Sequence, residues 1–220
     1  MTRSARGRRA DAATAVRYRA AVRHQAAARC LGYPDAELLD QLPLLRAAVG
    51  DEDPLGRFLD HAGVTPLSEL AAHYTEVFDF RNRHSLHLSW WTDGDTRRRG
   101  TALLRFTQVY REHGLRLQGE ELPDFLPVVL EFSAATRSDA LLREHRPGLE
   151  LLRLALEEAA TPYAHVLTSV CATLPGASPA DRAQALALAR SGPPREDVGT
   201  GGELPPYGHL AQLPVLTGGR

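Results

Sequence analysis

The sequence predicts an all-α protein with a single helical domain, and three observations support this fold class. Apolar residues recur every three or four positions through most of the chain, which is the period of an amphipathic helix. Prolines, glycines and short polar side chains interrupt these segments where helices usually begin and end. The one stretch with weak strand-like alternation, residues 81–91, has no second strand to pair with, so we expect it to be a loop.

The composition is that of a folded globular domain with tails. The chain has 220 residues, of which 43% are hydrophobic and 24% charged, enough for one domain with its own core. We expect a disordered basic tail over residues 1–11, a helical domain over 12–190 and a flexible tail rich in glycine and proline over 191–220. The net charge of -1 gives no overall attraction to nucleic acid or anionic membranes. No stretch approaches the ~20 apolar residues that a membrane span needs.

The helices before residue 80 are predicted from their apolar stripes and their ends. The first should run from Ala12 to Leu31, where glycine and proline follow. Two shorter helices are expected over residues 35–49 and 54–61, the former interrupted near Pro43. Thr65 followed by Pro66 is a favourable helix start, and an apolar stripe follows it as far as Phe78.

The central part of the chain should contain a long surface helix and then a buried one. Residues 93–95 precede the first of these, and Gly114 ends it. The second, from Phe125 to Phe132, is apolar on nearly every side, which indicates burial at the centre of the domain. We expect Asp124 to cap it, which would place Pro127 at the third helical position, where a missing N–H costs nothing.

The remaining helical pattern covers residues 138–190. An apolar stripe continues from Ser138 to Leu174, with Pro147 and Pro162 marking breaks or helix starts. Residues 178–190 form the last predicted helix.

No catalytic motif is present in the sequence. It contains no glycine-rich phosphate loop, no G-x-S-x-G elbow and no H-E-x-x-H pair, so we expect no enzymatic activity. His84 and His87 could form a metal site with nearby aspartates, but a structural site needs further ligands at defined spacing. Cys30 and Cys171 lie far apart without metal-ligand or redox spacing, and we expect both to be buried.

Three features between residues 90 and 131 point to a binding surface. The run Gly94–Gly100 places three arginines at the positive end of a helix, so an internal carboxylate, a bound anion or an acidic partner should compensate them. Glu131 lies in an apolar run and therefore needs a partner or a solvent-facing groove. Trp90 and Trp91 are adjacent, so in an extended segment one of them would stay exposed, where it could hold an apolar peptide.

Three motifs together resemble the nitrate reductase molybdenum-cofactor assembly chaperones, the NarJ family. They are Tyr74 to Asp79, Gly94 to Gly100, and Glu121 to Phe132, and they occur in the family's order and spacing. The resemblance is strongest over residues 70–135 and extends from 12 to 174 on the order of the helices. It implies an all-helical fold shared with the wider group of chaperones for molybdenum oxidoreductases.

The resemblance also implies a function and a set of site residues. Such chaperones bind the N-terminal segment of the apo catalytic subunit of a respiratory nitrate reductase in the cytoplasm. They keep it competent for insertion of the molybdenum cofactor, which they do not hold stably, and they delay its membrane assembly. An apolar groove with charged rims would hold an amphipathic client segment. The client-binding residues implied are Tyr74, Phe78, Trp90, Asp95, Arg97, Arg99, Glu121, Pro123, Asp124, Pro127 and Glu131.

Each group of these residues has an expected role. Tyr74 and Phe78 would form apolar groove wall, Asp124 and Glu131 acidic contacts, and the two prolines at 123 and 127 a rigid edge. The residues Asp95, Arg97 and Arg99 would bind the client or lock the fold.

Two other functions stay open at the level of sequence. The arginine-rich N-terminus would suit a helical DNA-binding regulator, although the near-neutral net charge argues against one. A small metal-dependent helical enzyme would use His84 and His87, and metal analysis of the protein would decide that alternative.

Overall fold

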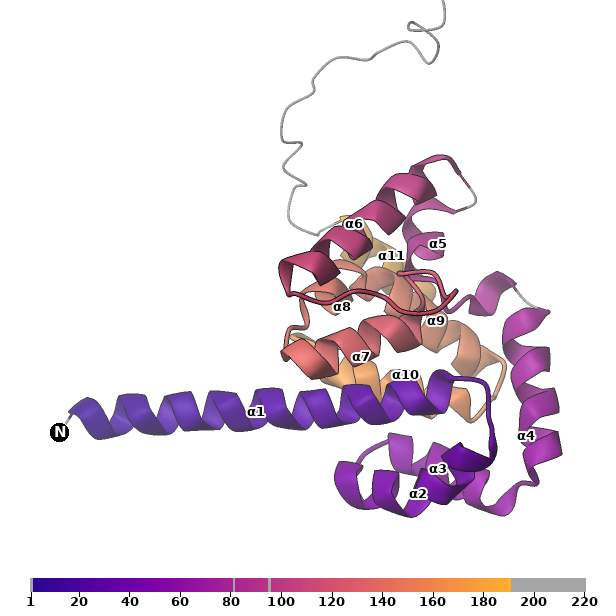
Figure 1. Cartoon of the computed structure of the whole chain (residues 1–220), viewed down its shortest axis with the longest axis horizontal. Helices are drawn as coiled ribbons and strands as arrows, with labels where there is room; N and C mark the ends of the chain where they lie inside the picture. The colour runs from indigo at the N-terminus through magenta and orange to yellow at the C-terminus, as the bar shows by residue number, and fades with distance from the viewer. Residues whose placement is uncertain (1, 81, 95, 191–220) are drawn as a thin grey trace, which may run out of the picture. The chain divides into compact units, whose positions relative to one another are not determined.

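The computed structural model describes residues 2–80, 82–94 and 96–190, which form helices joined by connections of varying length (Figure 1). Every described helix belongs to one compact unit, residues 1–190. The predicted all-α class is confirmed. The predicted tail over 191–220 lies outside the described residues. No helix in the described part of the chain combines the length and apolarity that a membrane crossing requires.

The first helix, α1, spans Thr2–Leu31 and lies along α7 and α10 (Figure 1). It begins before the predicted start at Ala12, so helical backbone replaces the expected tail over residues 2–11. Residues 12–19 are exposed on all sides of the helix, whereas its C-terminal end is buried. That end carries small side chains, Ala26, Ala27 and Cys30 among them, which let the neighbouring helices approach closely.

The next helices are α2 (Ala36–Val49), α3 (Leu55–Val64) and α4 (Leu67–Tyr74). The interruption predicted near Pro43 is wrong, because that proline lies inside one continuous helix. Asp35 caps α2 by accepting a hydrogen bond from the backbone N–H of Leu38 at 2.8 Å. Helix α4 continues into a π-helical turn, Thr75–Asp79, a form that often marks a functional site.

The segment predicted as a loop over residues 81–91 is partly helical. It contains a 3₁₀ turn, Asn82–His84, and the helix α5, Leu88–Asp93. Between them, His87 forms an antiparallel bridge with Phe125, and backbone hydrogen bonds flank it on both sides. This pairing could not be predicted from a strand pattern, because the partner is the single residue Phe125 in the approach to α7.

Helix α6 spans Arg98–Glu112, and the buried central helix is α7, Leu126–Thr136. The predicted N-cap is wrong: Phe125 occupies that position, and its side chain makes no capping hydrogen bond. Pro127 is therefore the second residue of α7, not the third. The predicted central burial of α7 is confirmed, since Leu126, Val129 and Leu130 are fully buried.

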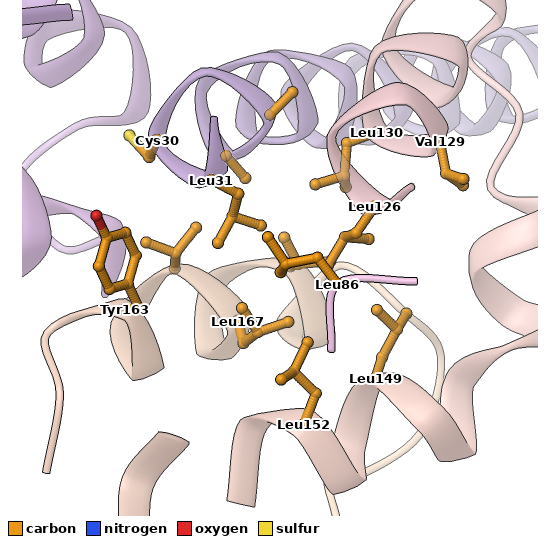
Figure 2. Close-up of a cluster of buried hydrophobic side chains, with 14 of the residues drawn as sticks. Cys30, Leu31, Leu86, Leu126, Val129, Leu130, Leu149, Leu152, Tyr163 and Leu167 are labelled. Atoms are coloured by element: carbon orange, nitrogen blue, oxygen red, sulfur yellow. The ribbon is translucent and has the colours of Figure 1, made fainter. Parts of the chain in front are cut away.

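The chain then forms α8 (Ala140–Glu144), α9 (Arg146–Glu158), α10 (Tyr163–Ala172) and α11 (Arg182–Arg190). Prolines 147 and 162 stand at the starts of α9 and α10, as predicted. Figure 2 shows side chains from α1, α7, α9 and α10 meeting in the core around Leu86. Cys30 and Cys171 are both free and buried, as expected, and burial raises the pKa of the Cys30 thiol to about 12.

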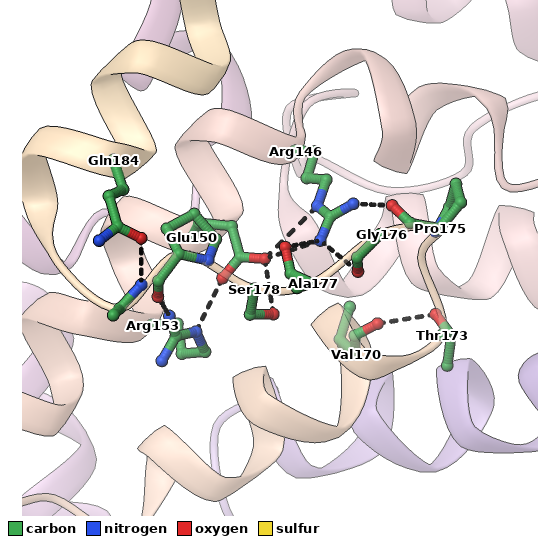
Figure 3. A network of polar contacts seen from close by, with 12 residues as sticks. Arg146, Glu150, Arg153, Val170, Thr173, Pro175, Gly176, Ala177, Ser178 and Gln184 are labelled. Atoms are coloured by element: carbon green, nitrogen blue, oxygen red, sulfur yellow. Dashed lines mark hydrogen bonds and ion pairs between the residues drawn. The ribbon is translucent and has the colours of Figure 1, made fainter.

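A buried ionic network on α9 holds the connection between α10 and α11 (Figure 3). Glu150 is fully buried and accepts hydrogen bonds from Arg153 at 2.8 Å and from Ser178 at 2.8 Å, while Arg146 lies 3.3 Å away. The two arginines also donate to backbone carbonyls of residues 175–179. These contacts satisfy the buried charges and fix the segment that leads into α11.

Candidate functional site

Seven of the eleven predicted site residues line two neighbouring grooves. The first, which we call the Tyr74 groove, has a volume of about 290 Å³ and lies between the π-helical turn and α5. The second, the Glu131 groove, has a volume of about 500 Å³ and lies between α7 and the connection after α6. Phe125 lines both grooves, so they meet at the bridge that precedes α7.

Aromatic rings form the base of the Tyr74 groove. Tyr74 is only 7% exposed, and its hydroxyl donates to the carbonyl of Leu31 at 3.2 Å. Burial raises the pKa of this hydroxyl, so it stays protonated. The rings of Tyr74 and Phe78 lie 4.9 Å apart, and Phe78 also packs on Tyr163. Tyr74 therefore supports the groove from below, while the half-buried Phe78 and Trp90 offer surface to a ligand.

The carboxylate of Asp124 is fully buried beneath the Tyr74 groove. Its two oxygens accept hydrogen bonds from His87 Nδ1 at 3.1 Å, from the backbone N–H of Ser89 at 3.1 Å and from the Ser89 hydroxyl. Burial alone would raise the pKa of Asp124, but these hydrogen bonds outweigh it and hold the pKa below its ordinary value. Asp124 thus joins the approach to α7 to the start of α5, and a bound peptide would reach it only if these bonds opened.

Arg99 connects this buried carboxylate to the groove surface. Its Nε donates to the Ser89 hydroxyl at 3.2 Å, and its Nη2 lies 3.9 Å from Asp124 Oδ2. Internal compensation of the arginine run is therefore confirmed for Arg99, which still lines the Tyr74 groove. Arg97 is exposed and lines neither groove. Asp95 lies outside the described residues.

The Glu131 groove combines an apolar floor with acidic side chains at its rim. Glu131 projects from α7 and Glu121 from the preceding connection, and both are exposed. Of the two alternatives given for Glu131, a partner or a solvent-facing groove, the structure shows the groove. Arg116 is the one basic side chain among its lining residues. The apolar lining comprises Tyr110, Leu115, Leu117, Phe125, Pro127, Val128, Phe132 and Ala135.

The wall of the Glu131 groove is held by Tyr110 of α6. Its hydroxyl donates to the carbonyl of Pro123 at 2.6 Å, and its ring lies 4.8 Å from that of Phe132. Pro123 lines neither groove, so it acts through its backbone by anchoring the connection between α6 and α7. Pro127 is buried and lines the groove, and its role as a rigid edge stays a prediction.

Two parts of this site are not predicted by the sequence pattern. Phe125, which joins the grooves, is predicted there only as part of a buried helix, and Leu115 and Leu117 belong to none of the three motifs. Leu115 is 40% exposed although it is apolar, and it follows the glycine that ends α6. An apolar residue in a polar connection was the signal that could have pointed to it.

The two histidines considered as metal ligands make protein contacts instead. His84 is buried, and its Nδ1 donates to the carbonyl of Val77 at 2.9 Å, while His87 donates to Asp124. Within residues 2–80, 82–94 and 96–190, no cluster of three or more His, Cys, Asp or Glu side chains is arranged to hold a metal ion.

Comparison with known proteins gives consistent matches. A family model described as the nitrate reductase delta subunit matches residues 42–169. The nitrate reductase-like protein NarX of Mycobacterium tuberculosis is 40% identical over 154 residues, covering 68% of this chain and 24% of NarX. The Escherichia coli nitrate reductase molybdenum cofactor assembly chaperone NarJ is 36% identical over 148 residues, covering 62% of each chain. The chain thus spans about a quarter of NarX and less than two thirds of this NarJ.

A solved structure supports the fold. The chain superposes with a TM-score of 0.57 on a crystal structure described as a redox enzyme maturation protein from Archaeoglobus fulgidus. The two share 22% sequence identity, and the match covers 69% of this chain and 91% of the other.

Proposed function

The chain belongs to the nitrate reductase delta subunit family, and on that premise we propose that it is an assembly chaperone for a molybdenum-containing nitrate reductase. Its proposed client is the apo form of the catalytic subunit, bound at the N-terminal segment in the cytoplasm. Binding keeps the client open for insertion of the molybdenum cofactor and delays its assembly at the membrane. The chain itself is proposed to have no catalytic activity, no stably bound cofactor and no nucleic-acid partner.

The Glu131 groove is the observation that carries this proposal. Its volume of about 500 Å³ is within the usual range of ligand sites, and its apolar floor suits the apolar face of an amphipathic helix. Glu121 and Glu131 at the rim would pair with basic residues of the client, which fixes the register of the bound segment. We therefore expect the bound face of the client segment to carry both apolar and basic side chains.

The Tyr74 groove extends this surface beyond Phe125. A segment lying across Phe125 would contact Phe78 and Trp90 with apolar side chains and Arg99 with a carboxylate or a C-terminal carbonyl. In this arrangement Asp124 is a positioning residue. It holds the two walls of the Tyr74 groove in register through His87 and Ser89.

Calorimetric titration tests the proposal. The probe is a synthetic peptide from the N-terminus of the nitrate reductase catalytic subunit encoded with this chain, and a scrambled peptide is the control. We expect saturable binding at micromolar affinity or tighter, and no heat from the scrambled peptide.

Charge reversal at the rim shows where the peptide binds. E131K should weaken binding by roughly tenfold or more, because it replaces attraction with repulsion at a partly desolvated rim. E158K is the matched control, since Glu158 is an exposed helical glutamate that lines neither groove. Equal affinities of wild type and E131K would show that the Glu131 groove is not the client site.

A further inference from the structure

A third cavity, separate from both grooves, lies between α1 and the turn from α7 to α8. It has a volume of about 620 Å³, and we call it the arginine cavity. One wall is the α1 face that carries Ala13, Val16, Arg17 and Ala20. The opposite wall is formed by residues 133–143 together with Thr173 and Pro175.

The wall of the arginine cavity carries uncompensated positive charge. Arg143 pairs with Asp139, since its Nε and Nη2 each lie 2.8 Å from Asp139 Oδ2. Arg17 and Arg137 also line the cavity, and neither has a hydrogen-bond or ion-pair partner among the described residues. Two guanidinium groups are thus left to interact with a bound anion.

The floor of the cavity is polar but neutral. The Thr173 hydroxyl donates to the carbonyl of Val170 at 2.7 Å, so it must accept from His24 Nε2, 2.8 Å away. The other ring nitrogen, Nδ1, then accepts from the Ser133 hydroxyl at 2.9 Å. Burial lowers the pKa of His24 to about 4, so the ring is uncharged at neutral pH. The floor therefore adds no charge to the two arginines.

The backbone at Arg137 is an independent sign that its side chain is needed there. Arg137 ends α7 in the left-handed conformation, with φ 56° and ψ 28°, a position that usually holds glycine or asparagine. Within the described residues, Ala160 is the one other non-glycine residue with positive φ. Strained backbone that carries a functional side chain is a common feature of binding sites.

We propose that Arg17 and Arg137 together bind the phosphate group of a small molecule in the arginine cavity. Guanidinium groups match the geometry of phosphate oxygens and offer several hydrogen bonds each. The apolar side chains Ala13, Val16 and Ala20 line the same cavity and leave room for an organic group beside the phosphate. The ligand is therefore either free phosphate or a phosphate ester, and this site is independent of the client grooves.

Calorimetric titration at low ionic strength tests the site with two probes, inorganic phosphate and phenyl phosphate. We expect one binding site per chain for at least one of them. Tighter binding of phenyl phosphate would identify an ester as the preferred ligand, and equal affinity would identify the phosphate group alone.

Three variants distinguish binding in the arginine cavity from non-specific attraction of phosphate to surface arginines. R17Q and R137G should each weaken binding by about tenfold or more, as expected for the loss of a charge-assisted hydrogen bond. R111Q is the matched control, because Arg111 is an exposed helical arginine outside the cavity, and it should bind like wild type. R137G should also raise the melting temperature, because glycine relieves the strained backbone.

The proposal would be overturned by three results. They are the absence of saturable binding to the wild-type protein, unchanged affinity in folded R17Q and R137G, or an equal loss of affinity in R111Q. Client-peptide binding measured on R137G separates the two sites, since it should be unchanged.

Discussion

At the scale of single residues, Asp124 shows how a motif residue can serve a site without facing it. Its carboxylate is fully buried, and each oxygen is used by donors from the segment around α5. The hydrogen bonds give the fold a link between segments far apart in the sequence. The groove above it depends on that link, because His87 and Arg99 line the groove and contact Asp124.

Replacing Asp124 by asparagine should destabilise the fold by about 2–3 kcal/mol, since an amide offers only one oxygen to donors that now use two. Urea unfolding monitored by circular dichroism measures this loss. D51N is the matched control: the Asp51 side chain is 97% exposed, so the substitution should change the free energy of unfolding by no more than about 0.5 kcal/mol. Equal stability of D124N and wild type would contradict the role assigned to Asp124.

His24 makes stability depend on pH. Its pKa is about 4 in the folded protein because burial favours the neutral ring, against an ordinary value of 6.5. The unfolded chain therefore takes up this proton at a higher pH than the folded chain does. The stabilisation is complete above pH 6.5 and is lost as the pH falls toward 4, amounting to about 3 kcal/mol.

The measurement is the free energy of unfolding in urea at several pH values between 7 and 4. H24Q lacks the titrating ring, so its stability should fall less over this interval, although it will be less stable at pH 7. The carboxylate of Asp124 acts in a different window, because its lowered pKa matters only below about 3.8. If the free energy of unfolding fell equally with pH in H24Q and wild type, the acid sensitivity would belong to groups other than His24.

At the scale of helices, the sequence predicts those elements whose ends are determined by residues close in the sequence. It does not predict an element, such as α5, that is held by contacts with residues far along the chain. The positions of Pro147 and Pro162 follow from proline rules that operate within a few residues. The start predicted at Thr65 and Pro66 is displaced by one residue, because Pro66 occupies the N-cap of α4 and the Thr65 hydroxyl donates to the carbonyl of His61 instead of capping the helix. Helix α5 was missed because its neighbourhood is ordered by Asp124 and by the bridge to Phe125. No pattern within residues 81–91 contains that information.

Close packing between α5 and α9 depends on Gly148. A Cβ atom at this position would lie 2.7 Å from the Cβ of Trp91, closer than real contacts allow. G148A should therefore destabilise the protein by about 1–3 kcal/mol through displacement of α5. The comparison is G100A, at an exposed position of α6 with open space around it, which should stabilise the protein by about 0.5–1 kcal/mol. Urea unfolding measures the change in the free energy of unfolding, which should be a loss for G148A and a gain for G100A. A neutral or stabilising G148A would contradict the packing described.

The network on α9 should matter more than a surface ion pair of the same kind. E150Q leaves Arg146 and Arg153, each 7% exposed, without their shared carboxylate, and should cost about 3–5 kcal/mol. Glu144 pairs with Arg105, whose side chain is 62% exposed, so E144Q should cost less than about 1 kcal/mol. Thermal and urea unfolding measure both values, and similar costs would mean that the buried network is not what secures the connection to α11.

At the scale of the whole molecule, the sequence predicted the fold class, and it left a solvent-facing groove as one of two alternatives for Glu131. It could not predict that Tyr74, Asp124 and Pro123 lie inside or behind the surface, because burial depends on how α1, α4 and α7 meet. It also could not predict that Phe125 joins two grooves. The motif residues therefore divide into those that line a groove and those that support the groove from within.

The central claim is that the client segment lies in the Glu131 groove, and site-specific photo-cross-linking tests it most directly. A photoreactive phenylalanine derivative is placed at Leu115 in the groove, or at Leu104 on α6, which is 71% exposed and lines neither groove. Each protein is irradiated with the apo catalytic subunit of the nitrate reductase, and the adducts are mapped by mass spectrometry. We predict an adduct from position 115 to the N-terminal segment of the client and none from position 104. No adduct from position 115, or equal adducts from both positions, would contradict the account.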